Sequence, residues 1–432
     1  MRIFIIGQCT LHWGRMEYGN IGNYYIIKPM FEQLRRVYPD VELATTMQLS
    51  EEFCHRYDVD VVPMEYYYDF NSTDNVTMAK AEYEAVLENK EIESGYLQEV
   101  KKADLVIDFS GDIWGDNADF LGEGRFLTGI YKDLSAQYLK PTIMLAGSPG
   151  PFKDSDHMEL VKNAYAGFDL VINREKISSR LLKEQGFELS NTKDFPCPSW
   201  LFEPCNMEEV KKYIDNPKFY DSKKLRVGMI LCGWNFQRPP FDLWPREERE
   251  YDNFINVINY LIKQFHAEIF LLSHSNGFPI PPKAFELQHG RDFKIMSQLY
   301  NIIDEEIKEN VTLLDGVYPA EVTKGIISQF DVLISGRMHG AVAGLASCVP
   351  TMIMDYGHEP KAHKLKGYSE IAGIEEYIAD PNNRDDLLFR SKLCVENRNI
   401  IQDVLKKNMA EIKKEACNQF DFISKKFQYL KG

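Results

Sequence analysis

An arginine and a histidine, Arg337 and His339, stand two residues apart, directly after the apolar run 332–335 and the glycine Gly336. Because the small residues of 340–346 come next, the pattern predicts a buried strand, a tight turn and the start of a helix. The amino end of a helix offers N–H groups and a positive dipole end to an anion. Arg337 adds a permanent cation with a two-pronged donor face, and His339 adds a group that can carry a proton near neutral pH. The stretch therefore predicts an anion site with a candidate acid beside it.

The two side chains converge only under one condition. In a regular helix, residues i and i+2 point apart, so the turn has to precede the helix proper. The step from Ser335 to Gly336 permits such a turn, because glycine adopts backbone conformations that are closed to other residues.

The composition bounds the class of protein. The chain has 432 residues, which exceeds one compact core and predicts two or three domains. Its net charge is −15 and its lysines and arginines form no block, so we expect no nucleic-acid partner.

The eight cysteines form no C-x-x-C pair, which favours a reducing compartment. The first apolar run is too short for a signal peptide, and no stretch reaches the ~20 apolar residues of a membrane helix. We therefore expect a cytoplasmic protein.

Short apolar runs separated by helical patterns recur in two sets along the chain. The first set comprises 3–7, 41–45, 104–109, 142–147 and 169–173, and the second comprises 225–231, 267–272, 311–314, 331–334 and 351–355. Strands that alternate with helices predict a parallel sheet covered on both faces. We therefore expect an α/β protein with two Rossmann-like domains facing a cleft.

The expected boundaries are residues 1–205 for the first domain, 206–224 for a linker, 225–385 for the second domain and 386–432 for a helical tail. The linker is expected where prolines punctuate a polar, charged stretch. The tail carries apolar residues at helical spacing, so we expect it to pack back on the first domain. Its lysines would also suit a helix on a membrane surface, but the acidic residues between them weigh against that alternative.

Five motifs that stand in one order resemble those of the polysaccharide pyruvyltransferases, over roughly residues 1 to 368. They are Gly19-Asn20-Ile21-Gly22-Asn23, the segment 104–112, the segment 146–152, the pattern Arg174, Ser178, Leu182 and Gly186, and Arg337-Met338-His339-Gly340 with the later segment 350–354. Two of the motifs depart from the family. Asn23 stands where an aspartate is usual, and Ser110 and Asp112 stand where the family carries more glycines.

The resemblance implies two Rossmann-like domains in a GT-B-like arrangement. It also implies a transferase that moves a pyruvyl group from phosphoenolpyruvate onto two hydroxyls of a sugar, as a cyclic ketal, in the biosynthesis of a bacterial surface polysaccharide. Phosphoenolpyruvate would be a co-substrate, and we expect neither a cofactor nor a metal. The acceptor would be a sugar or a lipid-linked oligosaccharide, which would bring the protein into peripheral contact with the inner face of the plasma membrane.

The chemistry of this donor suggests roles for the residues in the motifs. Phosphoenolpyruvate carries a phosphate and a carboxylate, so the reaction needs cations for both and one acid that protonates the enol carbon. We expect His339 to be the acid and Arg337 to hold the anion beside it. The other expected donor contacts are Arg174, Gly336, Gly340 and Lys361, and the expected acceptor contacts are Asn20, Asp112 and His274.

Each of these residues also has a purely structural interpretation. Arg337 would pair with a carboxylate from the facing domain, and His339 would only cap its helix. Arg174 would lie in solvent at the start of a helix. Ordinary turn, strand-end or solvent positions would explain the others, which are Asn20, Asp112, His274 and Lys361.

Two other functions stay open on the same fold. One is a nucleotide-sugar glycosyltransferase, and the other is a non-catalytic sugar-binding relative. The sequence contains no P-loop, no Gly-x-Gly-x-x-Gly dinucleotide fingerprint and no Gly-x-Ser-x-Gly nucleophile elbow, so the enzymes that depend on those motifs are not expected.

Overall fold

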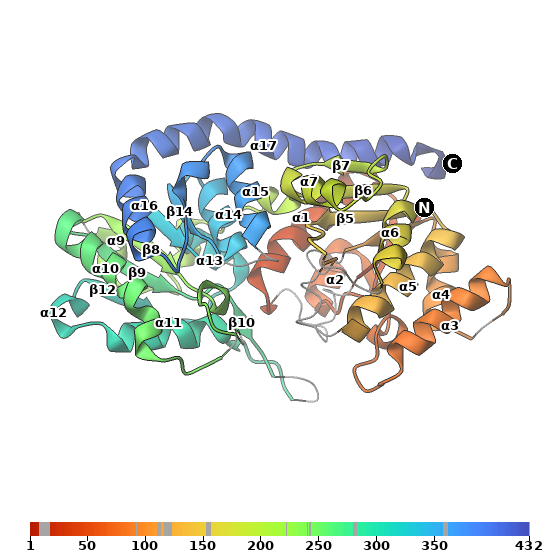
Figure 1. Cartoon of the computed structure of the whole chain (residues 1–432), viewed down its shortest axis with the longest axis horizontal. Coiled ribbons are helices and arrows are strands. Elements are labelled where there is room, and N and C mark those ends of the chain that lie inside the picture. Colours follow the sequence, from red (N-terminus) through yellow and green to blue (C-terminus); the bar gives the residue numbers. More distant parts are fainter. Residues whose placement is uncertain are drawn as a thin grey trace. The chain divides into compact units, whose positions relative to one another are not determined.

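The computed structural model describes residues 1–7, 18–91, 93–109, 114–115, 123–152, 157–221, 223–239, 241, 243–279, 283–356 and 362–431. The chain divides into two compact units. The first unit comprises Met1–Met16, Lys28–Pro198 and Glu415–Gly432, and the second comprises Glu17–Ile27 and Ser199–Lys414. Each unit is an α/β layer structure in which helices cover a parallel sheet (Figure 1).

The sheet of the first unit has the order β3-β2-β1-β4-β5-β6-β7, and its neighbouring strands are parallel. The strands are β1 (Arg2–Ile6), β2 (Glu42–Thr45), β3 (Val59–Val61), β4 (Leu105–Asp108), β5 (Thr142–Gly147), β6 (Leu170–Asn173) and β7 (Thr192–Asp194). Every residue of β4, β5 and β6 is buried, which explains why these strands read as continuous apolar runs. The chain order reverses direction between β1 and β4, as in a Rossmann sheet.

Helices cover both faces of this sheet. They are α1 (Ile21–Val37), α2 (Glu51–Tyr57), α3 (Asn75–Leu87), α4 (Gly95–Lys102), α5 (Glu123–Leu139), α6 (Met158–Gly167) and α7 (Lys176–Glu184). Local side chains fix several starts. The Ser50 hydroxyl accepts a hydrogen bond from the Phe53 N–H at the start of α2, and the Ser94 hydroxyl accepts one from the Leu97 N–H at the start of α4.

The second unit repeats this topology. Its parallel sheet has the order β12-β9-β8-β13-β14-β15, so the direction reverses between β8 and β13. The strands are β8 (Arg226–Ile230), β9 (Glu268–Leu272), β12 (Val311–Leu314), β13 (Val332–Ser335), β14 (Thr351–Met354) and β15 (Ile378–Ala379), and a separate hairpin pairs β10 (Asn276–Gly277) with β11 (Gln288–His289). The helices are α8 (Met207–Val210), α9 (Pro217–Asp221), α10 (Asp252–Phe265), α11 (Arg291–Ile302), α12 (Glu305–Lys308), α13 (Ala320–Ile327), α14 (Met338–Ala346), α15 (Ala362–Ala372), α16 (Arg384–Glu396) and α17 (Arg398–Lys426).

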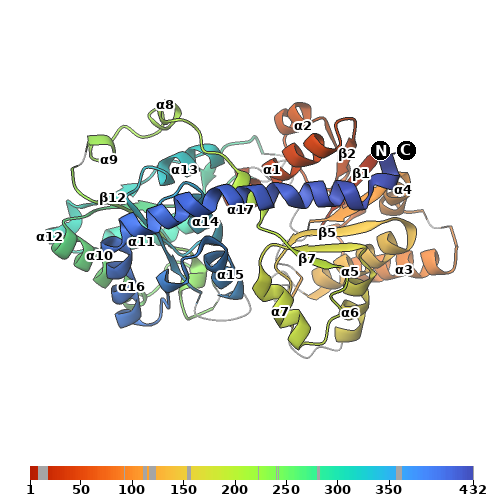
Figure 2. The same ribbon diagram turned by 90° about the horizontal axis from the view of Figure 1, so that it is seen from above.

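Two helices belong to both units. The first turns of α1 lie in the second unit, where Tyr25 donates a hydrogen bond to the carbonyl of Ala320 and its ring lies 4.4 Å from that of Phe202. The long helix α17, drawn as one unbroken coil in Figure 2, changes unit after Lys414. Its last turns belong to the first unit, where Asp421 pairs with Arg36 at 2.9 Å.

The structural division also differs from the boundaries expected from the sequence. The main segment of the second unit begins at Ser199 rather than near residue 225, because Trp200 stacks on Tyr368 of α15. The segment expected to be a linker, 206–224, contains α8 and α9. Phe219 of α9 is buried with its ring 5.5 Å from that of Phe270 in β9, so this segment packs into the second unit.

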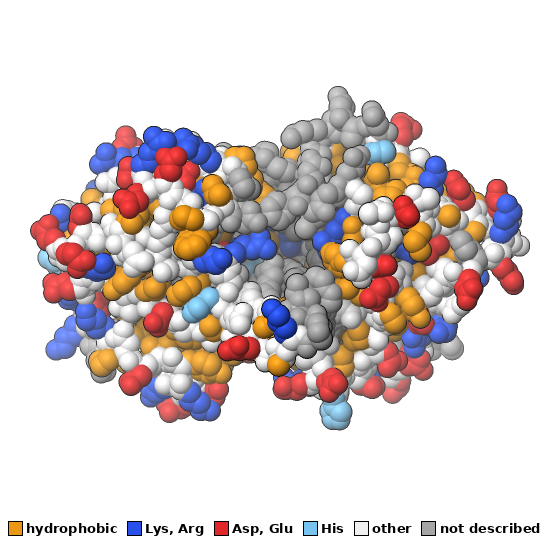
Figure 3. All heavy atoms as spheres, turned by 90° about the horizontal axis from the view of Figure 1, so that it is seen from below, with side chains coloured by type: hydrophobic (Ala, Val, Ile, Leu, Met, Phe, Trp, Pro, Cys, Tyr) orange, Lys and Arg blue, Asp and Glu red, His pale blue; other side chains and the backbone are white. Residues whose placement is uncertain are grey.

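No helix that the described residues form is both long enough and apolar enough to cross a membrane. On the face drawn in Figure 3, acidic and basic side chains are interspersed.

The core of the first unit contains a buried carboxyl group that should make the stability of the protein depend on pH. Asp133 of α5 is 1% exposed, and neither of its carboxylate oxygens has a hydrogen-bond partner among the described residues. Burial, and then the charge of Asp108 at the end of β4, raise the pKa of Asp133 well above its ordinary value. The folded protein therefore holds a proton that the unfolded chain releases near pH 4.

Replacing Asp133 by asparagine should stabilise the protein increasingly as the pH rises. Because the folded state binds the extra proton, the unfolding free energy of the wild type falls by up to about 1.4 kcal/mol for each pH unit between the unfolded and the folded pKa of Asp133. Thermal unfolding of Asp133→Asn and wild type at pH 5, 6, 7 and 8 should show a Tm difference that widens with pH. The exposed Asp40→Asn is the control. A Tm difference that stays constant from pH 5 to 8 would contradict the protonated state of Asp133.

Candidate functional site

The residues expected to do chemistry in the second unit lie at the carboxyl ends of its central strands. Arg337 follows β13 and His274 follows β9. The loop after β8 lies beside the turn after β13, because β8 and β13 are neighbours at the point where the strand order reverses. Open α/β sheets bind their ligands at this topological switch point.

The turn after β13 is clamped to the loop after β8. The Gly336 N–H donates to the carbonyl of Ile230 at 2.7 Å, and the Gly336 carbonyl accepts from the Asn235 side-chain amide at 3.3 Å. A Cβ atom on Gly336 would lie 2.0 Å from Oδ1 of Asn235, so only glycine fits. Because its N–H is already bonded within the protein, Gly336 shapes the turn, and the donor contact expected for it is not available through this group.

Helix α14 begins without a side-chain cap. Arg337 is its N-cap residue in an extended conformation, with φ −106° and ψ 127°, and makes no side-chain capping bond. Arg337 therefore lies outside the helix, while His339 lies in its first turn, which is the arrangement that the sequence required for their convergence. Within the described ranges, the N–H groups of Met338 and Gly340 have no hydrogen-bond acceptor. These amides give the end of α14 the capacity to bind an anion.

Arg337 is held by a carboxylate of its own unit. Its Nε donates to Oδ2 of Asp292 at 2.8 Å, and its Nη2 donates to Oδ1 of the same residue. Burial lowers the pKa of Arg337, but the charge of Asp292 outweighs this and raises it above its ordinary value, so the guanidinium stays charged. The Arg337 side chain is 20% exposed, and within the described part of the chain its Nη1 has no partner. The carboxylate thus comes from α11, not from a facing domain.

His339 packs against the first turn of α1. A Cβ atom on Gly22 would lie 2.4 Å from Nδ1 of His339, so glycine is required for this approach. Asn20 sets the start of α1, since its Oδ1 accepts from the Gly22 N–H at 3.1 Å and its carbonyl accepts from the Asn23 N–H. The loop that carries Asn20 therefore belongs to the same unit as Arg337 and His339.

His274 is buried beside this arginine. Its ring lies 5.5 Å from that of Tyr25 and is 2% exposed. Burial, and then the positive charge of Arg337, lower the pKa of His274 to about 3, so the imidazole is neutral at physiological pH. Its Nε2 has no hydrogen-bond partner among the described residues. The role of His274 as an acceptor contact stays a prediction, and the ring has little surface with which to make one.

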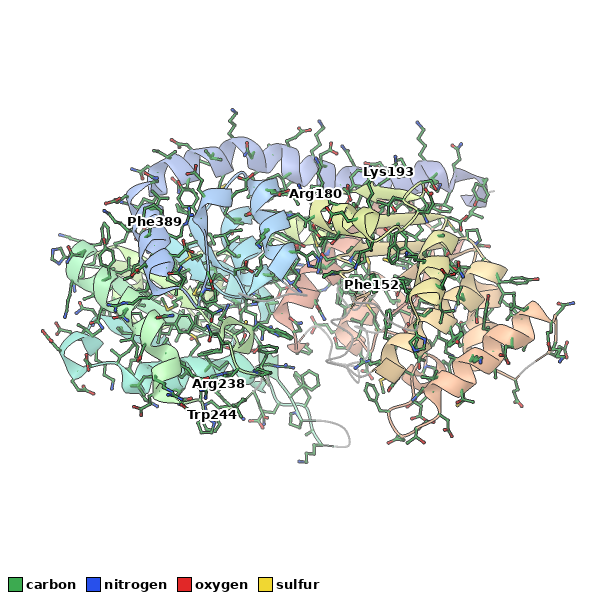
Figure 4. The ribbon with its side chains drawn as sticks, viewed as in Figure 1. Phe152, Arg180, Lys193, Arg238, Trp244 and Phe389 are labelled. Atoms are coloured by element: carbon green, nitrogen blue, oxygen red, sulfur yellow. The ribbon has the colours of Figure 1, made fainter. Side chains whose placement is uncertain are left out.

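In the first unit, Arg174 follows β6 as expected, but it does not lie in solvent. It is 2% exposed, and its Nε donates to the Ser148 hydroxyl at 2.7 Å. Ser178, one turn on, is buried and bonded to Glu175, which caps α7. The loop near Ser148 is fixed at Phe152, whose N–H donates to Gln185 and whose ring stacks on another phenylalanine at 5.3 Å (Figure 4).

Two expected residues, Lys361 and Asp112, lie outside the described residues. One residue that sequence reasoning missed is Asp292. The sequence did carry a signal for it. Gly290-Arg291-Asp292 opens α11, and an acidic residue in this position is typical of the first turn of a helix. Within the described ranges, no three histidine, cysteine or acidic side chains lie close enough together to hold a metal ion.

Comparison with known proteins identifies the class of enzyme. The model of the family described as polysaccharide pyruvyl transferase matches residues 20–358, well over half of the chain. The chain belongs to this family, and it is therefore a transferase, as the motifs predicted. No curated protein matches the sequence.

Solved structures with a similar fold are distant in sequence. A putative UDP-N-acetylglucosamine 2-epimerase from Listeria monocytogenes has a TM-score of 0.57 at 10% identity, covering 99% of this chain and 97% of that one. The HepE protein of Anabaena in complex with UDP has a TM-score of 0.57 at 12% identity, covering 99% and 100%. A glycosyltransferase from Rickettsia africae has a TM-score of 0.56 at 11% identity, covering 100% and 97%. This likeness shows the fold alone and confirms the expected GT-B-like class with two Rossmann-like domains.

Proposed function

We propose that this transferase moves the pyruvyl group of phosphoenolpyruvate onto two hydroxyls of a sugar, forming a cyclic ketal in the biosynthesis of a bacterial surface polysaccharide. The observation that carries the proposal is the uncapped start of α14 at the switch point of its sheet, with Arg337 before it and His339 in its first turn. Membership of the family supports the same reaction.

The donor is a small molecule with two anionic groups. The N–H groups of Met338 and Gly340 and the Nη1 edge of Arg337 would hold one of them, because charge-assisted hydrogen bonds to an oxyanion are the strong ones. Arg174 and Lys361 stay donor contacts predicted from the sequence. In the second unit, Asn20 would meet the acceptor, since its side chain is exposed at the start of α1. Asp112 and His274 stay acceptor contacts predicted from the sequence.

His339 supplies the proton that starts the reaction. As an imidazolium it donates to C3 of phosphoenolpyruvate, which leaves C2 electron-poor. One sugar hydroxyl attacks C2, and its proton returns to the imidazole. Phosphate then leaves with the electron pair of the C2–O bond. The second hydroxyl closes the ring, and its proton leaves on the phosphate. One mole of inorganic phosphate is released for each ketal formed.

The acceptor sugar is most simply lipid-linked, since surface polysaccharides are assembled on lipid carriers. The proposal therefore places the enzyme in the cytoplasm, in peripheral contact with the inner face of the plasma membrane. It requires no cofactor and no metal beyond the co-substrate itself.

The test is the release of inorganic phosphate from phosphoenolpyruvate in the presence of galactosides, mannosides and their lipid-linked forms. The expected result is release that requires both donor and acceptor. A parallel thermal unfolding series compares phosphoenolpyruvate with UDP- and GDP-sugars. Stabilisation by phosphoenolpyruvate supports the proposal. Stabilisation by a nucleotide sugar alone, with no acceptor-dependent phosphate, would overturn it in favour of a glycosyltransferase.

A further inference from the structure

The carboxylate that holds Arg337 lies in the interior of the second unit. Asp292 is fully buried, whereas the arginine that it pairs with is 20% exposed. The pair is bidentate, with one carboxylate oxygen facing Nε and the other facing Nη2. Forty-five positions separate the two residues in the sequence, so the contact depends on the tertiary fold.

The position of Asp292 is set by the loop after β9. The Asp292 N–H donates to the Ser275 hydroxyl at 3.1 Å, and the Gly290 N–H donates to the Ser275 carbonyl at 3.2 Å. Asp292 lies in the first turn of α11, where the positive end of the helix dipole favours a negative charge. The loop after β9 and the start of α11 therefore hold the Asp292 carboxylate beside Arg337.

Helix α11 is itself fixed at two points along its length. Gln298 exchanges hydrogen bonds with the backbone of Arg246, at 3.0 and 2.6 Å. Further towards its start, the indole N–H of Trp244 donates to the carbonyl of Lys294 at 3.1 Å. Trp244 and Arg238, both labelled in Figure 4, come from the long loop between β8 and α10. Asp292 thus stands on a rigid element.

A lone arginine has many rotamers and holds a ligand at an entropic cost. The bidentate pair removes that freedom and occupies the Nε edge, so the Nη1 edge is the one left for a ligand. The ion pair with Asp292 also carries no net charge. Arg337 would therefore recognise a ligand by the direction of its hydrogen bonds rather than by long-range attraction.

We propose that Asp292 is a positioning residue of the transferase, which fixes the Arg337 guanidinium so that its Nη1 edge meets an anionic group of the donor. This inference rests on the proposed function. Asp292 touches no reacting atom and acts only through the arginine.

The same sheet offers a matched control. At its amino edge, the Asp331 carboxylate accepts from the Arg226 backbone N–H at 2.8 Å and from its Nη2 at 3.2 Å. Asp331→Asn removes the charge from an aspartate–arginine pair of the same unit, at the end of the strands opposite to the site. It should lower the Tm without changing the kinetics of the donor.

Asp292→Asn should raise the KM for phosphoenolpyruvate by about 10- to 100-fold and change kcat by less than about threefold. Asp292→Glu keeps the charge but moves the carboxylate by one methylene, so a positioning role expects a higher KM here too. A role in stability alone predicts a lower Tm for Asp292→Asn and Asp331→Asn, with the KM unchanged in both. Unchanged KM values in both Asp292 variants would overturn the inference.

A wrong reaction can be distinguished from a wrong role for Asp292. If the wild type releases no phosphate from phosphoenolpyruvate with any acceptor, the reaction is wrong, and binding of inorganic phosphate by calorimetry then tests Asp292 by itself. The expected result is an affinity about tenfold weaker in Asp292→Asn than in wild type or Asp331→Asn. Equal affinities, or a wild type that binds no phosphate, would overturn the positioning role.

Discussion

His339→Gln should lower the kcat of the pyruvyl transfer by about 10²- to 10⁴-fold, the range that a positioned general acid contributes. Glutamine has nearly the same size as histidine and still forms hydrogen bonds, but it cannot deliver a proton to carbon. Binding of phosphoenolpyruvate should change by less than about threefold, because the α14 amides and Arg337 are untouched. Steady-state kinetics and calorimetry with the donor measure the two effects.

The control for this variant is His55→Gln, since His55 is an exposed histidine of α2 in the first unit. Its kcat should equal that of the wild type. A His339→Gln enzyme whose kcat lies within about threefold of wild type would remove His339 from the chemistry. A loss of donor binding equal to the loss of kcat would show instead that the imidazole supports binding.

Gly22→Ala should lower kcat by about 10²-fold, because displacing a catalytic group by about 1 Å costs that much. The new Cβ would lie 2.4 Å from Nδ1 of His339, so the imidazole has to move. Alanine is a better helix former than glycine by about 1 kcal/mol, so the start of α1 is not weakened by the change itself. The expected variant is therefore folded, with low activity and with a Tm lowered by the displacement of the imidazole.

A glycine in the first turn of another helix controls for this substitution. Among the described residues, a Cβ atom on Gly124 of α5 would come nearest to Val76, at 3.5 Å, an ordinary contact. Gly124→Ala should leave kcat unchanged and should not lower the Tm. If Gly22→Ala retains full activity, the contact between α1 and His339 has no part in catalysis, and the glycine is needed only for packing.

The sequence predicted much of this architecture because most of its central strands are fully buried. Runs such as the one that forms β13 can be recognised without tertiary information, and their alternation with helices gave both Rossmann sheets. The start of α14 was also predictable, since Ser335 and Gly336 mark a turn before a run of small residues. This local signal placed Arg337 and His339 at the carboxyl edge of the second sheet.

The rest depended on contacts between residues that lie far apart in the sequence. Nothing near Arg337 indicates that its partner is Asp292, which lies 45 positions earlier. Nothing near Gly22 indicates that the first helix begins against His339. The segment 206–224 was predicted to be a linker because most of its residues are polar. Its few apolar residues, such as Phe219, are nevertheless buried in the second unit.

The shared helices have a consequence for how the chain reaches its native state. Because the second unit includes Glu17–Ile27, an excised fragment of residues 199–414 would lack the turn that packs on His339 and the ring that covers Phe202. Because the first unit includes residues beyond Lys414, it stays incomplete during synthesis until those residues leave the ribosome. Neither half is a self-sufficient module, so truncation is a poor way to dissect this enzyme, and melting of one half should weaken the other.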